Sequence, residues 1–273
     1  MNAALQVIYD RTVALAKEDP RVIAGYKSGS MGTKHEDVWS DVDPVLVIRD
    51  DAFDAFDRDL PGLFARAGVT PVMWWPERIN CETLKNYAVF FHHNGLLIQY
   101  DITIEAASRH PVRRLPSDRV IFDKAGVIEA DDSAHMMPGF APDRLLWTVE
   151  IYWIYAYILG KYLRRNDPFR LAAAQQELFQ AHVTILHALK PDVPLDWWPI
   201  LAKRVADAED RDILLTYLRQ TDRDKVLDVL HGQLAAFSRA ARRACAAWNQ
   251  VYPETFASAV TAHIKGIMSD LHR

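Results

Sequence analysis

The texture of the sequence changes near residue 140, and this change limits the fold more than any single motif. Before it, apolar runs with strand-like spacing alternate with helical segments, whereas nearly every later segment has helical spacing. No internal repeat and no Gly- or Ser-rich linker separates the halves. The sequence therefore predicts an α+β chain, with a mixed sheet and flanking helices over residues 1–140 and an all-α helical bundle over residues 141–273.

Helical and strand-like segments alternate in the first half. A proline soon after residue 17 ends an opening helix, which we expect over residues 2–17. Apolar residues at helical spacing predict a second helix over residues 53–64, with Gly68 as its cap and Pro61 as a break or kink. Asn94-Gly95 lies between two apolar runs and predicts a hairpin, because both residues tolerate positive φ. Strands are expected over residues 22–27, 43–48, 69–75, 87–93 and 96–104.

Helix signals continue through the second half. Asp167 is placed as an N-cap and Pro168 as a first-turn residue, so a helix is expected to start there. Helices are expected over residues 142–165, 168–189, 196–206, 208–219, 222–249 and 254–271.

Residues 145–160 are dense in Trp, Tyr, Ile and Leu. The segment is shorter than the roughly 20 residues of a membrane span and contains Glu150, so we expect a buried helix and no membrane contact. Its aromatic residues are expected to fill the seam between the halves or a subunit interface, which is compatible with a homodimer. A carboxylate in such surroundings needs a partner. Glu150 is therefore expected either to bind a cationic substrate or to form an ion pair with a C-terminal Arg or Lys.

Charge and cysteine usage exclude several classes of protein. The formal charge of −4 argues against a nucleic-acid binder, which would be basic. Cys81 and Cys245 are far apart in the sequence, so we expect two free thiols in a reducing compartment. The first residues include acidic Asp10 and no basic stretch before an apolar run. We therefore expect no signal peptide and a cytoplasmic location.

The stretch richest in chemical information is Gly29-Ser30, ten residues, and then Asp41-Val42-Asp43. Side chains alternate faces in a strand, so Asp41 and Asp43 are expected on one side and Val42 on the other. Two adjacent carboxylates repel one another unless a cation lies between them. A divalent metal with oxygen ligands, in the first place Mg²⁺, would supply that cation.

A third carboxylate fits the same pattern. In residues 96–104 the even positions are all apolar, whereas the odd positions near the centre are Gln99, Asp101 and Thr103. Asp101 is therefore expected on the polar face of a half-buried strand, where three carboxylates could meet around one or two metals.

Each of these residues also fits a plainer interpretation. Asp41 and Asp43 taken alone fit a solvated turn, and Asp101 taken alone fits simple exposure. The loop after Gly29 lacks the spacing of a P-loop, and its G-x-x-G precedes an acidic strand rather than the helix of an RNA-binding KH clamp. Pro44 has no N–H to donate, so the strand must start, bulge or have an edge there. The three aspartates taken together with Gly29-Ser30 favour a catalytic site over these plainer interpretations.

These residues carry a resemblance to a known family. Gly29-Ser30-x10-Asp41-Val42-Asp43, followed by Asp101 on a later strand, resembles the nucleotidyltransferase superfamily of DNA polymerase β. The chain looks most like the antibiotic nucleotidyltransferases, namely the aminoglycoside adenylyltransferases and the lincosamide nucleotidyltransferases. It is similar to them in length, in a motif near residue 40, in a helical C-terminal half, and over residues 120–126 and 160–165.

The resemblance implies an activity and roles for the motif residues. It implies transfer of a nucleoside monophosphate, usually AMP from ATP, to a hydroxyl of a small molecule, with two Mg²⁺ ions. Asp41 and Asp43 would hold Mg²⁺, and Asp101 would hold the second metal or take the proton of the hydroxyl. Gly29 and Ser30 would approach the phosphates, with Lys34 as a further contact.

Several points stay open at the level of sequence. Glu105 lies near Asp101 and could serve as the base, or contact the substrate, instead. Residues 1–140 would form the catalytic domain and residues 141–273 a substrate-binding or dimerisation domain. The acceptor is expected to be an aminoglycoside or a lincosamide, so that modification gives antibiotic resistance. The alternative is a non-catalytic or antitoxin-like nucleotide-binding protein with the same fold.

Overall fold

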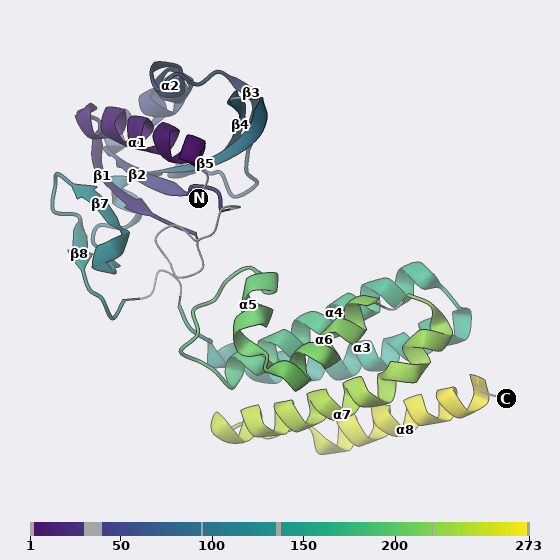
Figure 1. The fold of residues 1–273 in the computed structure, drawn as a ribbon. Coiled ribbons are helices and arrows are strands. Elements are labelled where there is room, and N and C mark those ends of the chain that lie inside the picture. The colour runs from purple at the N-terminus through teal and green to yellow at the C-terminus, as the bar shows by residue number, and fades with distance from the viewer. Residues whose placement is uncertain (1–2, 30–39, 94, 135–137, 220, 272–273) are drawn as a thin grey trace. The chain divides into compact units, whose positions relative to one another are not determined.

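The computed structural model describes residues 3–29, 40–93, 95–134, 138–219 and 221–271 (Figure 1). The chain divides into two compact units, Met1–Met136 and Met137–Arg273. The first unit holds a mixed β-sheet with flanking helices, and the regular elements described in the second unit are all helical. The predicted α+β fold class is therefore confirmed.

The main sheet of the first unit has six strands. They are β1 Val22–Lys27, β2 Pro44–Ile48, β3 Pro71–Pro76, β4 Leu84–His93, β5 Leu96–Ala106 and β7 Val120–Asp123. Their order across the sheet is β3-β4-β5-β2-β1-β7. β2 and β5 are parallel, and the other neighbouring pairs are antiparallel. The parallel pair at the centre joins two segments that are far apart in the sequence.

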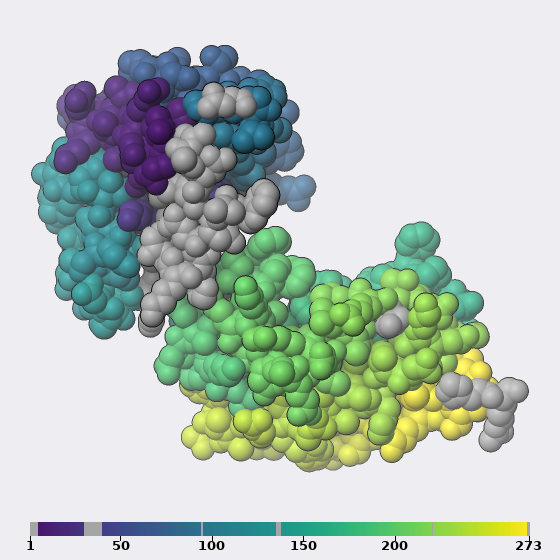
Figure 2. All heavy atoms as spheres, viewed as in Figure 1, coloured from purple at the N-terminus to yellow at the C-terminus, as the bar shows by residue number. Residues whose placement is uncertain are grey.

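Two helices, α1 Ala3–Glu18 and α2 Phe53–Arg66, pack on one face of this sheet. Their apolar sides and the even-numbered residues of β2 and β5 form one core, in which Tyr100 Oη lies 2.6 Å from Thr12 Oγ1. The outer side of α1, purple in Figure 2, is exposed. α2 continues through Pro61, and Gly68 follows it with a φ of 84°. The predicted cap position therefore needs a residue that adopts positive φ readily.

The opposite face of the sheet is covered over part of its width. A small parallel sheet of β6 Arg113–Leu115 and β8 Ile128–Ala130 lies in the second half of this unit. Leu115 and Ile128 pack there with Val45 and Val47 of β2. These side chains form a separate apolar cluster on the face opposite α1 and α2.

The strands follow the sequence prediction at the centre and depart from it elsewhere. His93 pairs with Leu96 across the predicted hairpin, and Gly95 has a φ of 78°. β4 begins at Leu84, three residues before the predicted start, because its polar N-terminal residues also pair with β5. Strands β6, β7 and β8 were not predicted. Each has only three or four residues, too few to show an alternating pattern.

Over residues 138–219 and 221–271, the second unit consists of six α-helices, apart from a 3-10 turn before the first. Asp167 caps one of them by accepting a hydrogen bond from the Arg170 N–H at 3.1 Å. In the core, the rings of Tyr152 and Phe237 stack at a centroid distance of 3.4 Å. The helices are α3 Leu145–Arg165, α4 Pro168–Ala188, α5 Trp198–Val205, α6 Ala208–Arg219, α7 Arg223–Ala247 and α8 Glu254–Leu271.

The aromatic helix α3 is amphipathic rather than buried on all sides. Tyr152 and Trp153 are buried in the core of their own unit, whereas Trp147 is 64% exposed. The expectation that all its aromatic residues fill a seam is therefore wrong for the two buried ones. None of the described helices has the length and apolar character that a membrane span requires. Both cysteines are free thiols, Cys81 exposed and Cys245 buried.

Candidate metal centre

Two of the motif carboxylates lie on the segment that enters β2. Val42 is completely buried in the core under the helices, so its neighbours Asp41 and Asp43 lie toward the opposite face. The backbone here is held on both sides. The Val42 carbonyl accepts a hydrogen bond from the Asp101 N–H at 3.0 Å, and the Asp43 carbonyl accepts one from the Ser28 N–H at 2.8 Å. β2 begins at Pro44, one residue later than predicted, and a proline with no N–H to donate suits the first position of a strand.

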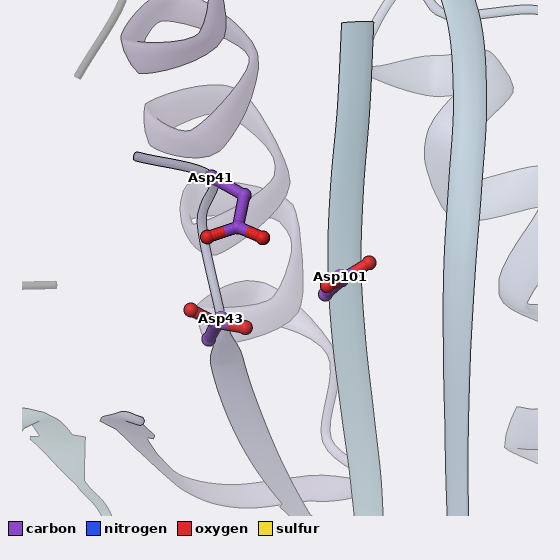
Figure 3. A group of neighbouring side chains, drawn as sticks. All are labelled: Asp41, Asp43 and Asp101. Carbon is purple, nitrogen blue, oxygen red and sulfur yellow. The ribbon is translucent and has the colours of Figure 1, made fainter. Parts of the chain in front are cut away.

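Asp101 reaches the same place from β5, the parallel neighbour of β2. Val45 pairs with Thr103, so the residues two positions earlier on each strand, Asp43 and Asp101, are neighbours across the ladder. Each of Asp41, Asp43 and Asp101 offers a carboxylate oxygen within 4.8 Å of those of the other two, and all three residues are half-buried. Figure 3 shows Asp41 and Asp43 on the entering segment and Asp101 on the strand beside it.

Burial and mutual repulsion act together on these carboxylates. Burial, with the charges of Asp41 and Asp101, raises the pKa of Asp43 to about 7, and Arg119 opposes this shift in part. Burial also raises the pKa of Asp101 to about 6, although Gln99 Nε2 donates to both its carboxylate oxygens at 3.0 Å. A cation bound between the three groups would remove the repulsion and favour their ionised forms.

The donor set suits a hard divalent cation. Carboxylate oxygens are typical ligands of Mg²⁺, and the oxygens around that ion lie about 3 Å apart when adjacent and about 4.2 Å apart when opposite. Oxygens already within 4.8 Å of one another need only small side-chain rotations to reach these spacings. Asp41, Asp43 and Asp101 therefore fit a magnesium site.

Gly29 lies directly against this cluster. It has a φ of 57°, and a Cβ at this position would lie 2.2 Å from Asp43 Oδ2. Any other residue would be strained and would displace the carboxylate. The structure thus brings Gly29 to the site, whereas Ser30 and Lys34, the other predicted nucleotide contacts, lie outside the described residues.

One residue at the site was missed by the sequence analysis. Arg119, just before β7, donates from Nη1 to the Gly29 carbonyl at 3.1 Å and lies 3.4 Å from the Ser28 carbonyl. It reaches them because β7 pairs with β1 and places Val120 beside Tyr26. Nothing in the local sequence indicates this contact, since it depends on the pairing of a strand that the sequence did not predict.

Glu105 does not join the carboxylates. It lies four residues beyond Asp101 on β5, about 13 Å along the strand. Its side chain is buried, and Oε1 accepts hydrogen bonds from Arg113 Nε at 2.6 Å and from Tyr26 Oη at 2.9 Å. A carboxylate held in a buried ion pair is a structural group, so the suggestion that Glu105 is the base or a substrate contact is not supported.

Glu150 is exposed on α3 in the second unit. The prediction that Glu150 needs a partner holds only for a buried carboxylate, so it is wrong for this exposed side chain. Its exposure removes the reason for expecting an ion pair and the reason for expecting a substrate charge beside it.

Comparison with known proteins adds little to this picture. No family model and no curated protein matches the sequence. A solved structure described as "Crystal structure of putative nucleotidyltransferase from H. pylori" matches at 11% identity and a TM-score of 0.29, covering 89% of this chain and 98% of that chain. A similarity at this level carries no argument about fold or activity, so the functional argument depends on the carboxylate site itself.

Proposed function

We propose that this protein is a magnesium-dependent nucleotidyltransferase that moves a nucleoside monophosphate, AMP from ATP in the first instance, to a hydroxyl of a small molecule. The observation that carries the proposal is the group of three carboxylates within 4.8 Å of one another, next to a glycine that no other residue could replace. Nucleotidyl transfer needs this combination, because charge on the phosphates must be offset while the chain passes close to them.

The three carboxylates would divide the work. Bound Mg²⁺ would offset the charge on the triphosphate and on the departing pyrophosphate. Asp41 and Asp43 would hold the metal, and the raised pKa of Asp43 shows how unfavourable their charges are when uncompensated. Asp101 would accept the proton of the attacking hydroxyl or ligate a second metal, since its carboxylate lies on β5 within 4.8 Å of the other two. A new bond from the acceptor oxygen to the α-phosphorus replaces the bond to pyrophosphate.

The turn at Gly29 would face the phosphates. Its backbone can approach a ligand closely because no side chain projects from it. Arg119 donates a hydrogen bond to the carbonyl of this residue, and so fixes the direction of the turn. Gly29 and Arg119 would thus position the nucleotide, while the aspartates act on it.

The acceptor class comes from the resemblance of the Gly29-Ser30 and Asp41-Val42-Asp43 motif to antibiotic nucleotidyltransferases. We propose an aminoglycoside or a lincosamide, with resistance by modification as the biological result. The helical second unit would contribute to acceptor binding or to dimer formation.

A mass-shift screen tests the proposed function. Purified protein is incubated with ATP, MgCl₂ and a panel of aminoglycosides and lincosamides, and each acceptor is examined for an added AMP together with release of pyrophosphate. Asp41→Asn should abolish both signals, whereas Asp54→Asn, an exposed aspartate on α2, should leave them unchanged. A protein that only binds nucleotide would release no pyrophosphate with any acceptor.

A further inference from the structure

The face of the sheet that carries Asp101 continues across two more strands. Asp101 on β5 pairs with Ala88 on β4, and Ala88 pairs with Trp75 on the edge strand β3. Directly paired residues of antiparallel strands project from the same face. Trp75 therefore lies in one row with Asp101, about 10 Å away across two strand spacings.

The next row repeats this arrangement. Gln99 pairs with Phe90, and Phe90 pairs with Met73. Trp75 is 52% exposed and Met73 is 51% exposed. We call these two side chains, with the half-buried Phe90 and the small Ala88, the Trp75 surface.

Packing within the first unit does not account for this surface. The adjacent Trp74 projects to the other face, where its ring lies 5.5 Å from that of Phe64 and 5.1 Å from that of Tyr87. Trp74 is thus the tryptophan that stabilises the core. Trp75 is half exposed, in the row of paired residues that ends at Asp101. Exposed apolar groups near a polar site are typical of ligand-binding surfaces.

A negative charge borders the Trp75 surface. The Glu77 N–H donates to the Asn86 carbonyl at 3.0 Å, which places Glu77 immediately after β3 on the edge of the sheet. Its carboxylate is close enough to the site for its charge to raise the pKa of Asp101. A ligand on this surface would therefore meet an aromatic face and an exposed carboxylate together.

The order of the strands indicates which of the two substrates, nucleotide or acceptor, would lie on the Trp75 surface. Gly29 follows β1 and contacts Asp43 beside β2, whereas Asp101 lies on β5, on the far side of β2. The attacking and leaving oxygens in nucleotidyl transfer lie roughly in line through the phosphorus. If the pyrophosphate leaves toward Gly29, the hydroxyl attacks from the side of Asp101, and the rest of the acceptor extends over β4 and β3.

We propose that the Trp75 surface binds the acceptor, with a hydroxylated ring stacked on the indole of Trp75 and a protonated amine of the same molecule paired with Glu77. This inference rests on the proposed function, because the direction of attack sets which substrate lies there. Stacking on the indole orients the ring, and Glu77 selects cationic acceptors over neutral ones.

Binding measurements test the surface without turnover. Kanamycin A is titrated into the full-length protein by calorimetry in 0.15 M NaCl, with Mg²⁺ and an ATP analogue that has a methylene between the α- and β-phosphorus. Trp75→Ala should weaken binding by about fivefold, since contact of a cationic ligand with an exposed indole has an effect of that size. Trp75→Phe should recover most of it. The matched control is Trp197→Ala, which removes a tryptophan 69% exposed in the other unit.

The contribution of the Glu77 carboxylate is tested in the same titrations. Glu77→Gln should weaken kanamycin A severalfold and leave its fully N-acetylated form unaffected, and Glu82→Gln, on the same β-hairpin, is the matched control. Unchanged binding in Trp75→Ala, or no binding of kanamycin A by the wild type, overturns the inference. If binding depends on Trp75 but no AMP is transferred in the screen, the proposed function fails and the binding surface stands. If AMP is transferred equally by wild type and Trp75→Ala, the proposed function stands and the Trp75 surface is not the acceptor site.

Discussion

At the scale of single residues, Asp43 is where burial and charge conflict most. Its pKa of about 7 in the folded protein lies well above 3.8, the ordinary value of an aspartate. Between pH 4 and pH 7 the metal-free folded chain therefore binds more protons at Asp43 than the unfolded chain does. The free energy of unfolding falls as pH rises through this window.

This conflict predicts how stability responds to pH and metal. Without Mg²⁺, the Tm of the sheet unit should be a few degrees lower at pH 8 than at pH 5, and saturating Mg²⁺ should restore it at pH 8. Asp43→Asn should raise the metal-free Tm at pH 8 and abolish the response to Mg²⁺. Differential scanning fluorimetry measures both effects. An equal Tm of the wild-type sheet unit at pH 5 and pH 8 without metal would contradict the prediction.

Gly29 offers a second test at this scale. Gly29→Ala should lower kcat/KM by roughly 100-fold, because its Cβ would displace the Asp43 carboxylate and small misplacements of catalytic groups have effects of this size. Gly126→Ala is the matched control. Gly126 also has positive φ, 67°, but an added Cβ there would meet nothing within 4 Å. It should cost about 1 kcal/mol of stability and no activity.

At the scale of elements, β5 carries two acidic groups with different tasks. Asp101 faces the metal centre near the middle of the strand, whereas Glu105 near its end holds Arg113 in a buried ion pair. Removing one partner of such a pair leaves the other charge buried and uncompensated. The two residues are therefore separable by experiment, although both are acids on one strand.

Substitutions on β5 should separate stability from activity. Arg113→Ala should lower the free energy of unfolding by about 3–5 kcal/mol in urea titrations at pH 7. Glu105→Leu combined with Arg113→Met should recover part of that loss. At temperatures where the variant is folded, Glu105→Gln should show the same pH dependence of the transfer rate as the wild type. Asp101→Asn should lose activity. Loss of the alkaline plateau in Glu105→Gln would mean that Glu105 is the base after all.

The elements also show what a sequence can predict. β1, β5 and the helices were expected within a few residues, because their apolar patterns are long enough to fix both type and face. The same alternation predicted that Asp101 would share a face with other polar groups. The contact between Arg119 and Gly29 could not be predicted, since it depends on the pairing of the four-residue β7. The burial of Glu150 was wrongly inferred from aromatic composition, which does not show that α3 has an exposed side.

At the scale of the whole molecule, the two units have separate hydrophobic cores, and we expect their stabilities to respond to acid in opposite directions. The core of the second unit contains His182, which shares a 3.1 Å hydrogen bond with Tyr217 Oη. Burial lowers the pKa of His182 to about 3, so the folded helical unit binds fewer protons than its unfolded chain below pH 6.5. Its stability falls as pH falls, whereas acidification protonates Asp43 and stabilises the sheet unit.

Calorimetry of the metal-free protein should therefore resolve two unfolding transitions whose temperatures shift in opposite directions as the pH changes. Between pH 7 and pH 5, the transition of the helical unit should shift to lower temperature and that of the sheet unit to higher temperature. Asp43→Asn should reduce the second shift only. His182→Gln, which cannot be protonated, should reduce the first only. A single transition with one pH trend would contradict the prediction.

The parallel pairing of β2 with β5 has a consequence for the order of events in folding. Asp43 and Asp101 become neighbours only when two strands distant along the chain have joined, and such long-range pairing is slow because the intervening loop must close first. We therefore expect the metal centre to be assembled late in the folding reaction. A bound ion would act as a lock on the finished sheet, slowing its opening while leaving the rate of its formation unchanged.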